Sequence, residues 1–149
     1  MQRMIFVNLP VRDLARATSF YQSMGFTKND QFSNDDAACM ALSETIIVML
    51  HTPEHFMRFS PKPIADSSKV CEVLLCVSEE SRAAVDGFVD KAISAGGVVD
   101  PCPRQDYGFM YGRSFEDPDG HIWEVMWMDP AAVERGCAEN AAMAEAETA

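Results

Sequence analysis

Apolar residues recur along this 149-residue chain with the period of a strand in some segments and the period of a helix in others, and the same order of these segments occurs twice. Residues 4–14 are a strand-like apolar run that passes into a helical pattern, which stops at Gly25. Residues 70–80 begin the same series again, with a helical stripe that stops at Gly96. Three short strand patterns follow each glycine stop, near residues 26, 37 and 45 and near residues 98, 109 and 121. Each half is therefore predicted to be a β-α-β-β-β module within an α+β fold.

The two halves are joined by a stretch whose composition indicates a connector, with two prolines, serines and scattered charges. We expect one compact domain, because the chain is long enough to bury a single core. Its predicted parts are a first module at residues 1–58, the connector at 59–69, a second module at 70–128 and an acidic C-terminal tail at 129–149. The tail is rich in Ala and Glu, so a surface helix or a frayed end is predicted there.

Charge and cysteine content narrow the possible partners. The chain has 12 basic and 23 acidic residues and a net charge of −11, which repels nucleic acid and anionic membrane surfaces. Its five cysteines are odd in number and form no C-x-x-C pair, which argues against a disulfide framework or a thiolate zinc site. No apolar run approaches the roughly 20 residues that span a bilayer, and the N-terminus has no signal-peptide layout. A cytoplasmic protein is expected.

A glutamate stands in the middle of the last apolar strand pattern. In F-E-D-P-D-G-H-I-W-E-V-M-W, residues 115–127, period-2 alternation places Glu124 on the face opposite to the two tryptophans, which point to the helices. The turn before it suits a type I turn with Gly120 in the left-handed conformation, forming a bulge that sets Ser114 across from Glu124. Without the bulge the register slips by one residue and Arg113 faces Glu124 in a salt bridge. The bulged register is favoured.

Two such modules, opening with V-N-L-P-V-R-D-L and closing with F-E-D-P-D-G-H-I-W-E, resemble the glyoxalase, bleomycin-resistance and extradiol-dioxygenase superfamily, also called vicinal oxygen chelate proteins. The likeness covers residues 4–128. It implies that the modules pair their sheets into a half-open, eight-stranded, barrel-like structure. It also implies a metal ion in the resulting cup, held by one inward side chain from the first strand and one from the last strand of each module.

The family's four ligand positions map onto two carboxylates and two apolar side chains. Glu72 and Glu124 match the positions in the second module, whereas Phe6 and Val48 or Met49 match those in the first and bind no hard divalent ion. The resemblance thus implies Glu124 as the principal catalytic or metal-binding residue and Glu72 as its partner, with one divalent ion such as Mg, Mn, Ni or Zn.

Both glutamates have alternative roles without a metal. If they share one pocket, their repulsion and burial raise one pKa and prepare a general acid or base. If instead each pairs with an arginine, such as Arg104 or Arg113, it serves only the fold.

Other candidate site residues surround these carboxylates. The predicted substrate pocket consists of Phe6, Asn8, Met49, Tyr107 and Ser114. Asn8 shares a face with Phe6 and could supply a neutral oxygen ligand, although a hydrogen bond to the backbone is the commoner role. Tyr107 belongs to a loop at the rim.

The histidines are less informative. His51 and His55 have a four-residue spacing that on one helix could bind a metal, but Pro53 starts the helix after His51. The two histidines are therefore interpreted as unrelated surface groups. His121 is interpreted as a turn-stabilising or exposed residue.

Two functions from different classes follow from the resemblance. The first is a small-molecule enzyme of the lyase or isomerase type, which abstracts a proton beside a carbonyl with a carboxylate base. The second is a metal-free protein like the bleomycin-resistance members, which sequesters a small ligand in a pocket at a dimer interface. The negative field of the protein favours a cationic ligand in that case. The resemblance also implies a homodimer.

Overall fold

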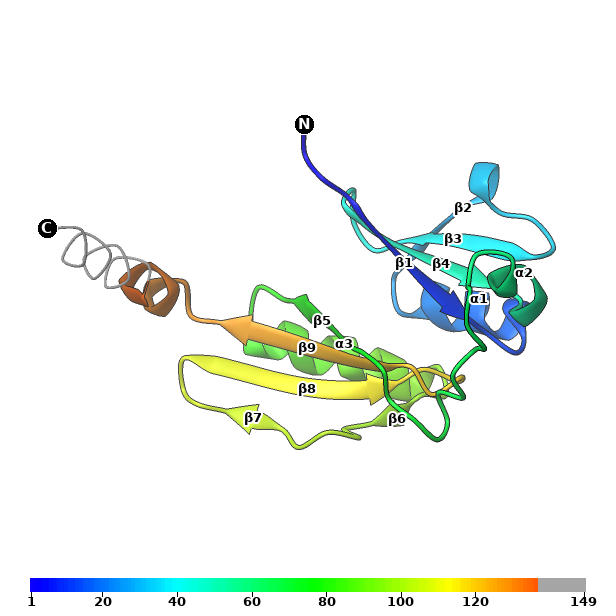
Figure 1. Cartoon of the computed structure of the whole chain (residues 1–149). Coiled ribbons are helices and arrows are strands. Elements are labelled where there is room, and N and C mark those ends of the chain that lie inside the picture. Colours follow the sequence, from blue (N-terminus) through cyan, green and yellow to red (C-terminus); the bar gives the residue numbers. More distant parts are fainter. Residues whose placement is uncertain (137–149) are drawn as a thin grey trace, which may run out of the picture.

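Figure 1 presents a computed structural model of the chain, in which a long helix lies against one face of each of two sheets. The structure describes residues 1–136. The first half consists of β1 (Ile5–Pro10), α1 (Leu14–Ser23), β2 (Thr27–Asn29), the 3-10 turn η1 (Asp30–Phe32), β3 (Ala37–Ala41), β4 (Ile46–His51) and α2 (Pro53–Met57). The second half consists of β5 (Leu74–Ser78), α3 (Arg82–Ser94), β6 (Val98–Val99), β7 (Gln105–Asp106), β8 (Met110–Glu116) and β9 (Ile122–Met128). A further helical segment begins at residue 130. The part of the predicted tail beyond residue 136 lies outside the described residues.

The strand order repeats between the halves. The first sheet has the order β1-β4-β3-β2 and the second has the order β5-β9-β8-β6, with β7 paired to β8. In each sheet the first and last strands of the half run parallel to each other, and the remaining pairs are antiparallel. The predicted α+β fold built from two β-α-β-β-β units is confirmed, and β7 is an additional short strand. Within residues 1–136 the sheets do not close into a barrel, and β1 and β5 each lie at a sheet edge.

Capping residues define where the long helices begin and end. The Asp13 side chain accepts a hydrogen bond from the Arg16 amide, and the Ser81 hydroxyl accepts one from the Ala84 amide, so each helix starts on a standard N-cap. The predicted stops at Gly25 and Gly96 both have positive φ, +95° and +94°, a conformation in which glycine is unstrained.

One aromatic core is shared by the two halves. Phe20 from α1 packs against Phe115 from β8, with ring centroids 6.2 Å apart, and Tyr21 packs edge-on against Trp123 from β9 at 6.2 Å. All four side chains are almost fully buried. Burying each large apolar side chain contributes about 1.5–3 kcal/mol, so the contact between the halves is a substantial part of the stability. The site described next lies at the edge of this core.

Candidate functional site

The turn between β8 and β9 has the bulged register that the sequence predicts. The Asp117 amide donates to the His121 carbonyl at 3.0 Å, and Gly120 has a φ of +92°. Ser114 consequently lies opposite Glu124, and the predicted pairing is confirmed. A Cβ atom on Gly120 would lie 2.7 Å from the Ser67 carbonyl oxygen, so the turn is also pressed closely against the connector.

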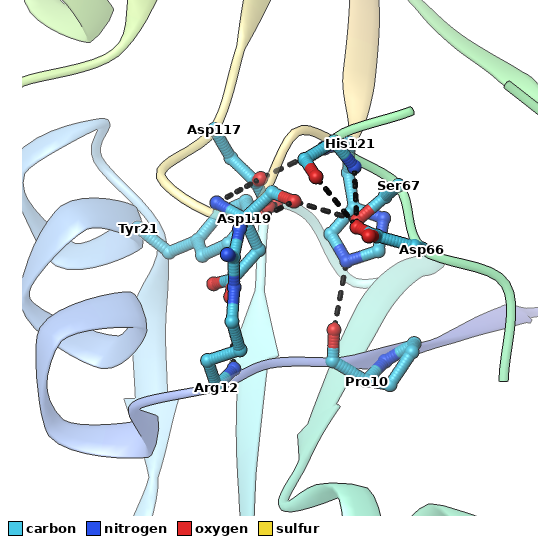
Figure 2. Close-up of polar contacts among 9 residues, drawn as sticks. Pro10, Arg12, Tyr21, Asp66, Ser67, Asp117, Asp119 and His121 are labelled. Atoms are coloured by element: carbon cyan, nitrogen blue, oxygen red, sulfur yellow. Dashed lines mark hydrogen bonds and ion pairs between the residues drawn. The ribbon is translucent and has the colours of Figure 1, made fainter. Parts of the chain in front are cut away.

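Asp117 in this turn is bound to the core of the first half (Figure 2). The Tyr21 hydroxyl donates to Asp117 Oδ2 at 2.7 Å and accepts from the Trp123 indole N–H at 3.1 Å. The other carboxylate oxygen of Asp117 accepts from the amides of Asp119 and His121, both at 2.9 Å. Burial raises the pKa of Asp117, and burial together with the charge of Asp117 raises the pKa of Tyr21 well above its ordinary value of 10.0. The Tyr21 hydroxyl therefore acts as a protonated donor.

The rest of the turn is bound to β1, to the residues that follow it and to the connector. Asp119 Oδ1 accepts from the Arg12 amide at 2.8 Å, and the Asp119 carbonyl accepts from the Ser67 hydroxyl at 2.6 Å. His121 Nε2 lies 2.8 Å from the Pro10 carbonyl oxygen, which can only accept, so this nitrogen carries the proton. The interpretation of His121 as a turn-stabilising group is confirmed, and its bond joins the two halves.

A cavity of about 300 Å³ lies beside this turn. Both halves and the connector form its walls, with lining residues that include Asn8, Phe56, Lys62, Val73, Glu72, His121 and Ile122. Its volume is at the lower end of the roughly 300–1,000 Å³ that is usual for small-molecule sites, and its walls combine apolar surface with a few polar groups. Among the predicted pocket residues, Asn8 is the one that lines this cavity.

Glu124 lines a different and much smaller recess, of about 60 Å³, on the face of the second sheet opposite to α3. Its neighbours across the strands are Cys76 on β5 and Ser114 on β8. Desolvation, together with the charge of Glu124, raises the pKa of the Cys76 thiol. The recess has about a fifth of the volume of the large cavity, so an organic molecule at Glu124 would lie across its open mouth rather than inside it.

Comparisons with known proteins agree with this architecture. The family model described as the Glyoxalase/Bleomycin resistance protein/Dioxygenase superfamily matches residues 3–125. The chain belongs to this superfamily. A comparison with curated protein sequences gave no match.

Several solved structures have the same fold. A hypothetical protein from S. aureus is 26% identical, with a TM-score of 0.70 over 85% of this chain and 94% of that one. Lactoylglutathione lyase from Agrobacterium tumefaciens is 17% identical, with a TM-score of 0.62 over 85% of this chain and 94% of that one. The fosfomycin resistance protein from Listeria monocytogenes is also 17% identical, with a TM-score of 0.61 over 85% of this chain and 93% of that one. At that identity the likeness shows the fold alone. Among the described residues, no helix is long and apolar enough to cross a membrane.

Neither predicted glutamate of this superfamily member is neutralised by an arginine. Arg113 binds Asp86, Asp90 and Asp100 instead, and Arg104 binds Asp100. No ion pair among residues 1–136 includes Glu72 or Glu124, so the alternative in which these arginines pair with the glutamates is wrong. Arg113 holds the loop at Asp100 against α3.

The structure does not bring Glu72 and Glu124 into one cavity. Glu72 precedes β5 and lines the large cavity, whereas Glu124 lines the recess. Cys76, the residue opposite Glu124, is four positions beyond Glu72, and four extended residues span about 13 Å. Three other predicted pocket residues, Phe6, Met49 and Tyr107, line neither cavity, and Ser114 lines the recess.

The residues around Glu124 do not fit the divalent ion that the superfamily implies. The cross-strand neighbours of this carboxylate supply one thiol and one hydroxyl, and the Ser114 hydroxyl already interacts with the backbone of Cys102. In residues 1–136 there is no group of three or more His, Cys, Asp or Glu side chains that could hold a metal ion. Such ions require several oxygen or nitrogen ligands that converge.

His51 and His55 form a pair that the sequence interpretation missed. His51 ends β4 and is only 4% exposed, and its Nδ1 atom lies 2.9 Å from Nδ1 of His55 in α2. The interpretation of these histidines as unrelated surface groups is wrong. Pro53 does begin the helix after His51, but the Thr52 N-cap turns the chain so that residues four apart still meet. The four-residue spacing was the available signal.

Proposed function

We propose that this protein binds a small organic molecule in the cavity of about 300 Å³ between its two halves, and that it sequesters this molecule without a metal ion at Glu72 or Glu124. The observation that carries the proposal is the composite wall of the cavity, to which β1, α2, the connector and the β8–β9 turn all contribute. Apolar side chains such as Phe56 and Ile122 supply most of the contact surface for an organic ligand.

The polar groups of the cavity favour a cationic ligand. Glu72 supplies a carboxylate, and His121 donates a hydrogen bond from its Nε2–H to the Pro10 carbonyl, so Nδ1 of the neutral ring can accept a hydrogen bond. Lys62 is the opposing charge in the wall, but the net charge of the chain is −11. The summed field therefore concentrates cations near the cavity mouth.

Ligand binding is tested by thermal shift and calorimetry with cationic antibiotics and small carbonyl compounds. A bound ligand at 100 times its Kd raises the free energy of unfolding by about 2.7 kcal/mol. Glu72→Gln is expected to weaken a cationic ligand, whereas Glu80→Gln, an exposed glutamate outside the cavity, keeps the affinity of the natural chain. The proposal fails if no compound stabilises the protein, or if both substitutions have equal effects.

A second candidate function, a lyase or isomerase, is supported by the state of Glu124. This carboxylate has no arginine partner among the described residues and stands beside the Cys76 thiol. In this role Glu124 removes a proton beside a carbonyl group, and Glu72 has no part in the step because it lines the other cavity. Exchange of substrate C–H for deuterium in D₂O tests this role. Exchange that Glu124→Gln abolishes supports the enzyme, and exchange that survives the substitution contradicts it.

A homodimer in the cytoplasm completes the proposal. The edge strands β1 and β5 carry exposed apolar side chains, among them Ile5, Phe6 and Leu74, and open apolar edges favour pairing with another copy. Sedimentation of the natural chain and of Phe6→Lys separates the outcomes, since a dimer through this edge dissociates in the variant. The odd number of cysteines without a C-x-x-C pair supports a reducing compartment.

A further inference from the structure

The two histidines of the first half present ring nitrogens to each other at the end of β4. Nδ1 of His51 and Nδ1 of His55 are 2.9 Å apart, and the ring centroids are 5.0 Å apart. Two neutral imidazoles at this distance share one proton, because one nitrogen must donate and the other must accept. The hydrogen bonds around the pair show which nitrogen donates and which accepts.

Asn8 determines the tautomer of His51. The Asn8 side-chain nitrogen donates to the Phe6 carbonyl at 3.2 Å, which leaves its Oδ1 facing His51 Nε2 at 2.8 Å. An amide oxygen only accepts, so Nε2 of His51 carries a proton and Nδ1 of the neutral ring has a free lone pair. The hydrogen bond from Asn8 to the backbone, which the sequence favoured, is confirmed. Its consequence is a His51 ring with a fixed orientation.

His55 is held beside it by its own contacts. Its backbone amide donates to the Thr52 hydroxyl at 3.3 Å, and its ring lies edge-on to Phe59, with centroids 5.2 Å apart at 88°. In the metal-free pair Nδ1 of His55 donates to Nδ1 of His51. The His55 side chain is only partly buried, so an ion has access to the pair from solvent.

We propose that Nδ1 of His51 and Nδ1 of His55 chelate one divalent ion of the borderline class, such as Zn²⁺, Ni²⁺ or Cu²⁺, with water or a small anion in the remaining positions. Two nitrogen ligands about 2.05 Å from a metal lie about 2.9 Å apart at a right angle and about 3.3 Å apart in a tetrahedron. The observed 2.9 Å therefore needs little change in the distance between the two nitrogens, while each ring turns by about 35–45° to point its lone pair at the ion instead of at the other nitrogen.

Metal binding by the neutral pair requires one proton to move within it. The His55 proton moves from Nδ1 to Nε2 when the metal takes its place, so the neutral pair releases no net proton. Imidazole is a preferred ligand of these ions, and an acceptor on the far nitrogen of a ligating histidine is the usual supporting contact, which Asn8 supplies here. This site is independent of Glu124 and Glu72.

The test uses the full chain after chelator treatment, titrated with Zn²⁺ by calorimetry and by NMR of ¹⁵N-labelled histidine rings. One ion per chain is expected, with shifts at Nδ1 of both His51 and His55 and a proton on Nε2 of both rings in the bound state. His55→Ala is expected to abolish this binding. Asn8→Ala is expected to weaken it about tenfold or more, because the tautomer of His51 is no longer fixed.

Glu44→Gln is the matched control, since it removes an exposed potential metal ligand at the other end of β4 and leaves the pair intact. The proposal is overturned if Zn²⁺ leaves both Nδ1 resonances unchanged, if His55→Ala binds with the affinity of the natural chain, or if binding is lost in the control. A Zn²⁺ ion held by cysteine thiolates instead would also leave both Nδ1 resonances unchanged and would overturn the proposal. The NMR measurement on the natural chain decides the question even if a variant does not fold.

Discussion

The Tyr21→Phe substitution tests how the β8–β9 turn is joined to the first half. It removes one hydroxyl from a fully buried side chain and changes no other contact of the ring. The lost bond to the Asp117 carboxylate contributes about 1.5–3 kcal/mol, as hydrogen bonds to charged groups do. The Trp123 N–H also loses its acceptor, which adds a desolvation cost of about 1–3 kcal/mol, partly relieved by relaxation. The free energy of unfolding is expected to fall by about 2–4 kcal/mol.

Urea unfolding followed by tryptophan fluorescence measures this change, because Trp123 reports directly on the altered site. The midpoint is expected to decrease with an unchanged m-value, and thermal unfolding is expected to move down by about 5–15 °C for a chain of this size. Tyr111→Phe is the matched control, since its hydroxyl also binds an aspartate, Asp86, but on the partly exposed face of α3, and it should cost less than about 1 kcal/mol. A loss below about 0.5 kcal/mol in Tyr21→Phe, or equal losses in both variants, would refute the role given to the turn.

Three further predictions concern the stability of the fold around the turn, the loop at Asp100 and the core. Arg113→Leu should lower the free energy of unfolding, measured in urea, by about 2–4 kcal/mol, because it removes a guanidinium that is only 6% exposed and leaves its aspartate partners unpaired. Arg104→Leu, which removes a side chain that is 58% exposed, should lower it by less than about 1 kcal/mol. Gly120→Ala should lower the free energy of unfolding by at least about 2 kcal/mol in the same assay, because its φ is positive and the new Cβ atom would meet the connector. Gly108→Ala should lower it by about 1 kcal/mol, because its φ is also positive but the space around it is open. Above pH 10 the unfolded chain loses a tyrosine proton that folded Tyr21 retains, so the free energy of unfolding should fall as pH rises. For this one group the fall is at most about 1.4 kcal/mol per pH unit. Tyr21→Phe should remove that part of the slope when unfolding is measured at several pH values.

The fold was predictable because its determinants are local and repeated. The helical stripe of α3 that the sequence indicates, Val85, Phe88, Val89 and Ala92, is the buried face in the structure. The register of β9 followed from turn chemistry, since Gly120 tolerates the positive φ that a bulge requires. That register then placed Trp123 in the core and Glu124 on the opposite face, as the alternation predicts.

The cavities were less predictable because they depend on where strands begin and on contacts far apart in the sequence. The apolar run that the sequence assigns to a strand starts at residue 70, but β5 starts at Leu74, and the preceding residues line the large cavity instead. Glu72 therefore leaves the sheet face of Glu124. The His51–His55 contact is not evident from the sequence either, because Pro53 excludes His51 from the helix but does not fix how the turn capped by Thr52 places the two rings.

The β8–β9 turn connects the core to the cavity through a few consecutive residues. Asp117 binds Tyr21 in the core, and His121, whose amide donates to Asp117, lines the cavity while its ring binds β1. Loss of the Tyr21 hydroxyl therefore loosens a wall of the cavity as well as the contact between the halves. A ligand of the cavity should bind Tyr21→Phe more weakly than the natural chain, although Tyr21 does not line the cavity. The polar motif buried at the junction therefore makes the shape of the cavity depend on how the two halves dock.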